Sequence, residues 1–485
     1  MSRSESISLQ ELPRERAAYT THDAGDELST LTTPDARQIE SSRKRALVLL
    51  GASISQLPIW GFSMSYGVFQ EYYTNHWTLS GDRGVTGVIG TTSNGLLYIS
   101  MPFLFAAFTR RWARKRQTAA AAGALLASAA FVLSSFSTHV WHLVATQGVL
   151  AAFGCAMVYS PTTLSLGEWF ATAAAGAGAG GRNHRAVVYG VTLSCKNVVG
   201  SVMPFLARAL LENYGFRVAV RVWAAILLAS GLLSIALIPT HPAILTTPST
   251  STDADTPPAR RRRTIPWSFL RHRTIYIYVI AIILQSAGYG IPQSYLPTYA
   301  REVTLLSQTS ATLLLTVFNI PGILASSLFG YLSDNRIYSL SATTVTAISA
   351  LSSSLAAFLL WGLASAQGSL AQLLLFSATF GFFAGGYSAT WGGVVNELES
   401  EAARCNEAVD PGMIYGLLNG ARGIGYVSGG LVSVPLLNAG GGTTPIGAFG
   451  YASTYGPLIL FTGLSSVFGG WGILWKWTSS LQRLM

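Results

Sequence analysis

The sequence predicts an all-α polytopic membrane protein in which twelve transmembrane helices form two six-helix repeats. Half of the 485 residues are hydrophobic, only 11% are charged, and the mean hydropathy is +0.40. Soluble domains contain about 25% charged residues. Stretches of about 20 apolar residues, long enough to cross a bilayer, recur from Ala46 onward, and the two halves share residues at a nearly constant offset. This composition excludes an ordinary soluble enzyme, a nucleic-acid-binding protein and a disordered scaffold.

Twelve apolar segments are expected to form the membrane-spanning helices. They comprise roughly residues 46–70, 85–108, 118–136, 140–163, 186–207, 218–238, 274–299, 310–332, 341–362, 369–393, 413–437 and 454–475. Residues 1–45 are polar, so we expect a disordered tail there. The other divisions are a first bundle at 46–238, a basic linker at 239–273, a second bundle at 274–477 and a tail at 478–485.

Lysine and arginine residues gather in the loops that share one side of the membrane if the helices alternate. Basic residues precede the first helix at 43–45, recur at 110–116 after the second helix, and form the arginine run 260–263 in the linker. Cytoplasmic loops carry such an excess of positive charge, so both termini are expected in the cytoplasm. The arginine run is expected to face anionic lipid rather than nucleic acid. We expect the plasma membrane, with the vacuolar membrane as the alternative.

The two halves repeat several polar and aromatic residues at offsets of 223 to 228 positions. The matched residues are Tyr66 and Tyr289, Asn94 and Asn319, Tyr159 and Tyr387, and Tyr189 and Tyr415. Four matches at almost one offset indicate an internal repeat of six helices. Two such parallel repeats, related by an axis along the membrane normal, place a binding site between the halves near the midplane.

Several motifs resemble known transporter sequences. The segment 330–336, Gly-Tyr-Leu-Ser-Asp-Asn-Arg, resembles the cytoplasmic loop signature of the major facilitator superfamily. Gly167-Glu168-Trp169-Phe170, with the stretches 185–186 and 212–217, resembles the monocarboxylate transporter family, and the stretches 382–391 and 420–425 resemble its fungal branch. Over about 45–477, this resemblance implies the major facilitator fold and a transport function. The fungal branch includes efflux carriers for secondary metabolites.

The resemblance also bears on individual residues. Gly330, Asp334 and Arg336 match the loop signature and are expected to form a conformational gate rather than a binding site. Proton-coupled members of the monocarboxylate transporter family carry a lysine in the first helix and an Asp/Arg pair in the eighth. The corresponding positions here fall near Met64, Ile320 and Leu324. Because none of the three charged residues is retained, the resemblance does not imply proton–lactate symport.

Lys196 and Arg422 occupy equivalent positions in the two halves, each seven residues after a matched tyrosine. A charged residue inside a transmembrane helix is costly and marks a functional site by default, so both are expected to face a central cavity. Each lies about ten residues, or roughly 15 Å, from the cytoplasmic end of its helix. Arg422 can hold a carboxylate with two hydrogen bonds, whereas Lys196 offers a point charge. The alternative is that each pairs with backbone carbonyls or extends toward the membrane surface.

Other residues are expected to line the same cavity because they are polar or aromatic and lie in the repeated helices. They are Tyr66, Asn94, Tyr289, Asn319, Tyr387 and Trp391. For the two asparagines a hydrogen bond between helices is an equally good interpretation, and for the aromatic residues ordinary packing is the alternative. The acidic residues fall in loops or at helix ends, so no buried carboxylate is expected to carry protons.

No pattern indicates a catalytic group, a metal, a cofactor or ATP. The glycine-rich run 176–181 resembles a dinucleotide-binding loop but lacks the strand that must precede it, and no glycine loop is followed by a Walker lysine. The sequence therefore predicts a carrier that moves a small organic acid or acidic secondary metabolite across the lipid bilayer, by efflux. Monocarboxylate uptake is the alternative, and a membrane-embedded enzyme is the alternative from another class.

Overall fold

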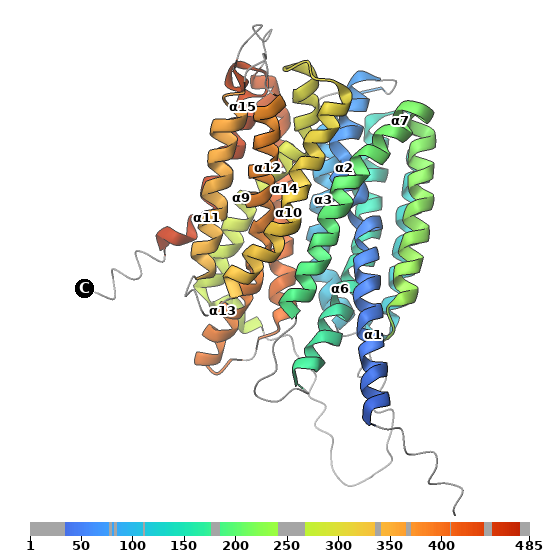
Figure 1. Ribbon diagram of the computed structural model, residues 1–485, viewed down its shortest axis with the longest axis vertical. Helices are drawn as coiled ribbons and strands as arrows, with labels where there is room; N and C mark the ends of the chain where they lie inside the picture. Colours follow the sequence, from blue (N-terminus) through green and yellow to red (C-terminus); the bar gives the residue numbers. More distant parts are fainter. Residues whose placement is uncertain are drawn as a thin grey trace, which may run out of the picture. The chain divides into compact units, whose positions relative to one another are not determined.

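The computed structural model describes residues 34–76, 80–81, 85–109, 112–175, 185–240, 267–334, 341–364, 370–407, 409–440 and 449–475. Its contacts divide the chain into two units, Met1–Lys44 and Arg45–Met485. In the first unit only the helical residues from Pro34 onward are described. In the second unit the helices run side by side (Figure 1).

The described part of the chain is helical and contains no strand. Before the linker the helices are α1 (Pro34–Ile54), α2 (Gln56–Asn75), α3 (Thr86–Thr109), η3 (Ala113–Lys115), α4 (Arg116–Ser134), α5 (Val140–Leu143), η4 (Val144–Leu150), α6 (Ala151–Ala175) and α7 (Arg185–Leu237). After it they are η6 (Trp267–Arg271), α9 (Arg273–Glu302), α10 (Gln308–Asp334), α11 (Ala342–Leu355), η7 (Ala356–Trp361), α12 (Leu370–Gly386), η8 (Tyr387–Thr390), α13 (Trp391–Arg404), α14 (Pro411–Ala439), η9 (Gly450–Ala452) and α15 (Gly456–Gly469).

Within the described residues, the helices agree with the predicted twelve membrane crossings. Ten helical segments are long and apolar enough to cross a membrane. One of them, Val188–Leu237, contains two helices, because Gly215 has φ 73° and ψ 174° and interrupts the helical backbone. A positive φ favours glycine, which has no Cβ. α14 is 29 residues long and supplies the twelfth helix.

Two predicted boundaries differ from the structure. α1 begins at Pro34, inside the segment predicted to be a disordered tail, because proline is tolerated in the first turn of a helix. The helix predicted at 369–393 continues through η8 and α13 to Arg404. Leu398 and Ala402 are buried on one face of α13, so this segment stays helical after it has become too polar to lie in lipid.

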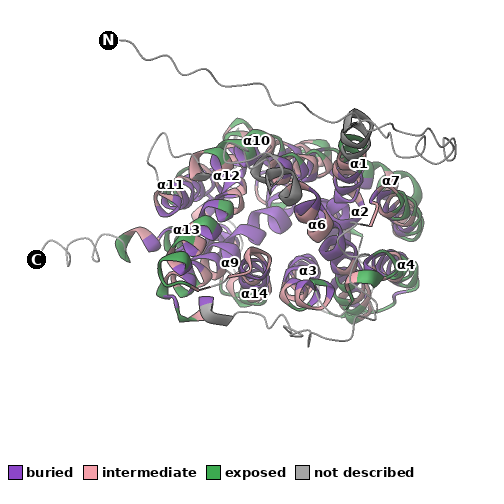
Figure 2. Cartoon of the chain, turned by 90° about the horizontal axis from the view of Figure 1, so that it is seen from below, coloured by how far each residue is buried: buried purple, intermediate pink, exposed green. Residues whose placement is uncertain are grey.

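The two halves meet along α3 and α14 and along α7 and α10, and Figure 2 shows α3 beside α14. Glycine allows this close approach. A Cβ on Gly423 would lie 2.5 Å from the carbonyl oxygen of Gly95, and one on Gly200 would lie 2.7 Å from Asn319 Cγ. Asn319 Nδ2 donates to the carbonyl oxygen of Gly200 at 3.2 Å. Backbone contacts therefore join the halves around the centre of the bundle.

The outer surface carries large apolar side chains, as contact with lipid requires. Phe103 and Leu324 are each 72% exposed and Ile320 is 48% exposed, and exposed residues lie mainly at the rim of the bundle in Figure 2. The positions aligned with the Asp/Arg pair of proton-coupled carriers thus point away from the protein interior.

We name the two ends of the bundle by the helices that begin or end there. The basic end is where α4, α7 and α14 begin, and the opposite end is where α2 and α9 end. At the basic end Arg116 forms two hydrogen bonds with Glu168, at 2.6 and 2.9 Å. This ion pair joins α4 to α6, which both belong to the first half.

Glycine packing gives a stability prediction with an internal control. A Cβ on Gly381 would lie 1.9 Å from the carbonyl oxygen of Phe318, whereas a Cβ on Gly392 would meet nothing within 4 Å. Gly381→Ala should lower the free energy of unfolding by about 1–3 kcal/mol. Gly392→Ala should leave it unchanged or raise it by up to about 1 kcal/mol, because alanine favours a helix. Thermal unfolding in detergent measures both, and equal stability of the two variants would contradict the packing described here.

Candidate functional site

Lys196 and Arg422 lie at matching depths in the bundle. Each is eleven residues after the first residue of its helix, Arg185 for α7 and Pro411 for α14. Lys196 is 7% exposed and Arg422 is 3% exposed. Both cations are therefore buried in the interior, as the matched positions in the two halves predict, and they come from opposite halves.

Lys196 contacts two aromatic side chains of the first half. Its Nζ donates a hydrogen bond to Tyr98 Oη at 3.3 Å. The same nitrogen lies 4.1 Å from the centre of the Trp60 ring. A cation above an aromatic face is attracted by the electron density of the ring, so Trp60 on α2 and Tyr98 on α3 stabilise the ammonium group without a formal negative charge.

Arg422 is surrounded by aromatic rings from both halves. The carbon atom of its guanidinium lies 5.1 Å from the ring centre of Tyr289, 5.3 Å from Tyr98, 5.6 Å from Tyr426 and 5.7 Å from Trp391. Tyr98 comes from α3 in the first half, and the other three come from the second. Arg422 is thus held at the boundary between the halves.

Tyr98 connects the two cations. Its hydroxyl accepts the hydrogen bond from Lys196, and its ring lies within cation–π distance of Arg422. The ring also stacks on Tyr426, with 5.9 Å between centres and 19° between planes. The lysine, the arginine and this tyrosine pair therefore form one site, which we call the two-cation site.

Among the described residues, the ion pairs of the structure include neither Lys196 nor Arg422. Arg422 Nε is buried and has no hydrogen-bond partner among them. Removing a charged group from water costs several kcal/mol, and the neutral rings offset only part of this. The two-cation site can therefore accept an anion, and Arg422 retains a donor for it.

A cavity lies between the two-cation site and the basic end. Its lining includes Gln56, Tyr159, Thr162, Thr192 and the tyrosine pair Tyr189 and Tyr415. These two tyrosines, matched in the repeat, stack with their ring centres 6.0 Å apart. Each precedes its cation by seven residues, or about 10 Å along a helix, so the cavity lies on the basic-end side of the cations.

Of the other predicted site residues, Tyr289 and Trp391 contact Arg422. The side chains of Tyr66, Tyr387 and Asn319 instead donate hydrogen bonds to backbone carbonyl oxygens. Tyr66 donates to the carbonyl oxygen of Thr86, and Tyr387 donates to that of Gly469 at 3.0 Å. Asn319 holds α10 against α7, as described above. Asn94 is buried in α3, one helical turn before Tyr98.

The predicted gate is described only in part. Gly330 lies near the end of α10, where an added Cβ would be 3.8 Å from the carbonyl oxygen of Ala389. Asp334 is the last residue of α10. Its side chain and the whole of Arg336 lie outside the described residues, so the role of these residues stays a prediction.

The sequence analysis did not identify Trp60, Tyr98 and Tyr426 as site residues. Two of them carried a usable signal. Tyr98 follows Asn94 by four residues and Tyr426 follows Arg422 by four residues, so each shares a helix face with a residue already identified. Trp60 carried no such signal, because a single tryptophan in an apolar helix does not indicate a binding site.

The hydrogen bond of Tyr98 generates a prediction about stability. Tyr98→Phe removes the acceptor of Lys196 but keeps the ring beside Arg422, and it should lower the free energy of unfolding by about 1–3 kcal/mol because a buried donor loses its partner. In a Lys196→Met background the same change should have little effect. Thermal unfolding of the four proteins measures this coupling. Equal losses in both backgrounds would show that Tyr98 does not hold Lys196.

Comparisons with known proteins identify the family of this chain. Residues 48–430 match the family model described as Major Facilitator Superfamily. The chain is 24% identical to the MFS-type transporter pynF of Aspergillus niger, over 82% of this chain and 83% of the relative. It is 23% identical to the aspyridones efflux protein apdF of Emericella nidulans, over 90% and 82%.

Similarity extends to animal carriers over a shorter region. Monocarboxylate transporter 12 of Homo sapiens is 25% identical over 55% of this chain and 52% of the relative. The family match covers most of the described helices, including α3, α7 and α10 and the part of α14 that carries Arg422. The chain therefore belongs to the major facilitator superfamily and is a multi-pass membrane transporter.

Proposed function

We propose that this transporter moves a small organic anion, with export of an acidic secondary metabolite as its function. One observation carries the proposal. Two buried cations from opposite halves share one aromatic residue, and among the described residues no carboxylate pairs with either. An anion in the two-cation site would neutralise charge that the protein leaves uncompensated.

The chemistry of the site supports a carboxylate or an enolate attached to an apolar body. Arg422 can donate two parallel hydrogen bonds to such a group, and Lys196 adds a point charge. Trp60, Tyr289 and Trp391 lie against the two cations, so an anion held there would have apolar rings beside it. Pockets of this kind, apolar with a few convergent polar groups, suit small organic molecules.

The relatives favour export as the direction. One fungal relative that aligns with nine-tenths of this chain is named as an efflux protein. The excess of Lys and Arg supports a cytoplasmic location for the basic end, and a cavity lies between the cations and that end. A metabolite made inside the cell could then enter the site from the cytoplasm. Plasma-membrane export would release it outside, and a vacuolar location would store it.

Uptake of a simple monocarboxylate is the second candidate. The observation that favours it is the similarity to monocarboxylate transporter 12 over about half of the chain. The four aromatic rings around Arg422 favour an anion with a larger apolar body than a simple monocarboxylate has.

The proposal is tested by metabolite export from the source organism. Acidic metabolites in cells and medium are compared between the parent, a strain lacking the gene, and strains carrying Lys196→Gln, Arg422→Gln or Lys196→Arg. The two charge-removing variants should lower the rate of export tenfold or more, which corresponds to about 1.4 kcal/mol. Lys196→Arg keeps the charge and should retain most of the activity.

The amount of each variant in the membrane is measured in parallel, because a buried cation could also matter for folding. Export at the parental rate by both charge-removing variants would overturn the anion site. Accumulation of a monocarboxylate inside the expressing cells, with no metabolite lost from the medium of the deletion strain, would support uptake instead.

A further inference from the structure

A second charged cluster lies at the opposite end of the bundle, away from the two-cation site. Glu71, in the last turn but one of α2, is 1% exposed. Its carboxylate pairs with Arg208 of α7, and its other oxygen lies 3.6 Å from Arg301 Nε. The burial of Glu71 is not evident from the sequence, in which the acidic residues are expected in loops or at helix ends.

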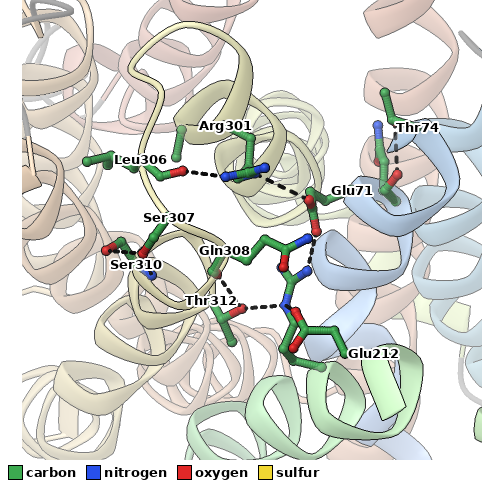
Figure 3. Close-up of polar contacts among 12 residues, drawn as sticks. Glu71, Thr74, Glu212, Arg301, Leu306, Ser307, Gln308, Ser310 and Thr312 are labelled. Carbon is green, nitrogen blue, oxygen red and sulfur yellow. Dashed lines mark hydrogen bonds and ion pairs between the residues drawn. The ribbon is translucent and has the colours of Figure 1, made fainter. Parts of the chain in front are cut away.

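The cluster crosses the boundary between the halves twice. Glu71 and Arg208 belong to the first half. Arg301 lies in the last turn of α9, in the second half. Arg208 Nε also donates to Thr312 Oγ1 of α10 at 3.0 Å. Thr312 in turn donates to the carbonyl oxygen of Gln308, and Arg301 Nη1 donates to that of Leu306 at 2.8 Å. Figure 3 shows these side chains converging between the helices.

Two donor atoms in this cluster lack a hydrogen-bond partner among the described residues. Arg208 Nη2 and Arg301 Nε are buried and have no hydrogen-bond partner among the described residues, although the latter lies near the Glu71 carboxylate. An unpaired buried donor costs free energy. The cluster therefore holds the halves together with less than its full set of hydrogen bonds, which suits a contact that must open and close.

Between this cluster and the two-cation site, a second contact joins α2 and α9. Gln293 Nε2 on α9 donates to Met64 Sδ on α2 at 2.9 Å, and both residues are buried. The segments 64–71 and 293–301 thus meet along the path from the opposite end to the two-cation site. The cavity, by contrast, lies on the basic-end side of the cations.

We infer that Glu71, Arg208, Arg301 and Thr312 form a clasp that closes the transport path at the opposite end. The clasp sets how often the path opens there, and its residues act as positioning residues that never need to touch the substrate. Alternating access requires such a contact, because the halves must separate at one end while they stay joined at the other. Removing a cross-half contact shifts the population toward the open state.

The structure supplies matched controls for this inference. Arg116 and Glu168 form a short ion pair at the basic end, but both belong to the first half. Glu212 lies 3.6 Å from Arg208 Nε on the same helix. Glu168→Gln and Glu212→Gln therefore remove ion pairs without removing a contact between the halves.

Hydrogen–deuterium exchange of the full-length purified protein tests the clasp. Glu71→Gln should raise exchange about tenfold or more in both 64–76 and 289–312, because opening admits water along the path. Thr312→Val, which keeps every charge, should raise exchange in the same two segments by a smaller factor. Glu168→Gln and Glu212→Gln should leave both segments at the parental rate. This readout needs no substrate, so its outcome is independent of the anion site.

Three results would overturn the inference. Parental exchange in both Glu71→Gln and Thr312→Val would show that the contacts do not limit opening. An increase confined to 71–76 would show that Glu71 only holds the end of α2. An equal effect of Glu168→Gln on 289–312 would show that any lost ion pair loosens the bundle. If Glu71→Gln fails to fold, Thr312→Val and Arg301→Gln, which alters a partly exposed side chain, decide between these outcomes.

Discussion

The rest of this structure depends on one constraint: two positive charges lie buried between the halves, and neither pairs with a carboxylate of the described residues. A lipid-facing lysine or arginine at that depth would be costly, so α7 and α14 must turn Lys196 and Arg422 inward. Neutral rings then take the place of acidic partners. Tyr98 links both cations from α3, which packs closely against α14 where Gly95 meets Gly423.

The same arrangement gives the transporter two ends with different properties. Toward the basic end, Tyr189 and Tyr415 stack across the boundary and leave a cavity beside them. Toward the opposite end, α2 and α9 are joined by the contact of Gln293 with Met64 and by the ion pairs of Glu71. Contacts between the halves therefore lie on both sides of the two-cation site, and movement of two repeats about a fixed site requires that the contacts at one end separate while those at the other hold.

Much of this could be predicted from the sequence, because composition and repeat offset depend on residue identity alone. The twelve helices and the depths of Lys196 and Arg422 follow from them. The rotation of each helix about its axis does not follow from the sequence. Asn319 and Tyr66 look as well suited to line a cavity as Tyr289 does, but they donate hydrogen bonds to backbone carbonyl oxygens of neighbouring helices. Glu71 lies near a helix end, as expected for the acidic residues, yet only the packing of α7, α9 and α10 around it shows that it is buried.

Selective binding of anions to the purified protein is the measurement that tests the central claim most directly. Unfolding temperatures are compared with matched pairs of ligands, such as benzoate with benzamide and cinnamate with cinnamamide, because a ligand that binds the folded state raises the temperature. The account predicts that at least one acid stabilises the parent protein while its neutral amide does not, and that Lys196→Gln combined with Arg422→Gln abolishes the difference. Equal stabilisation by an acid and its amide in the parent would contradict the anion site.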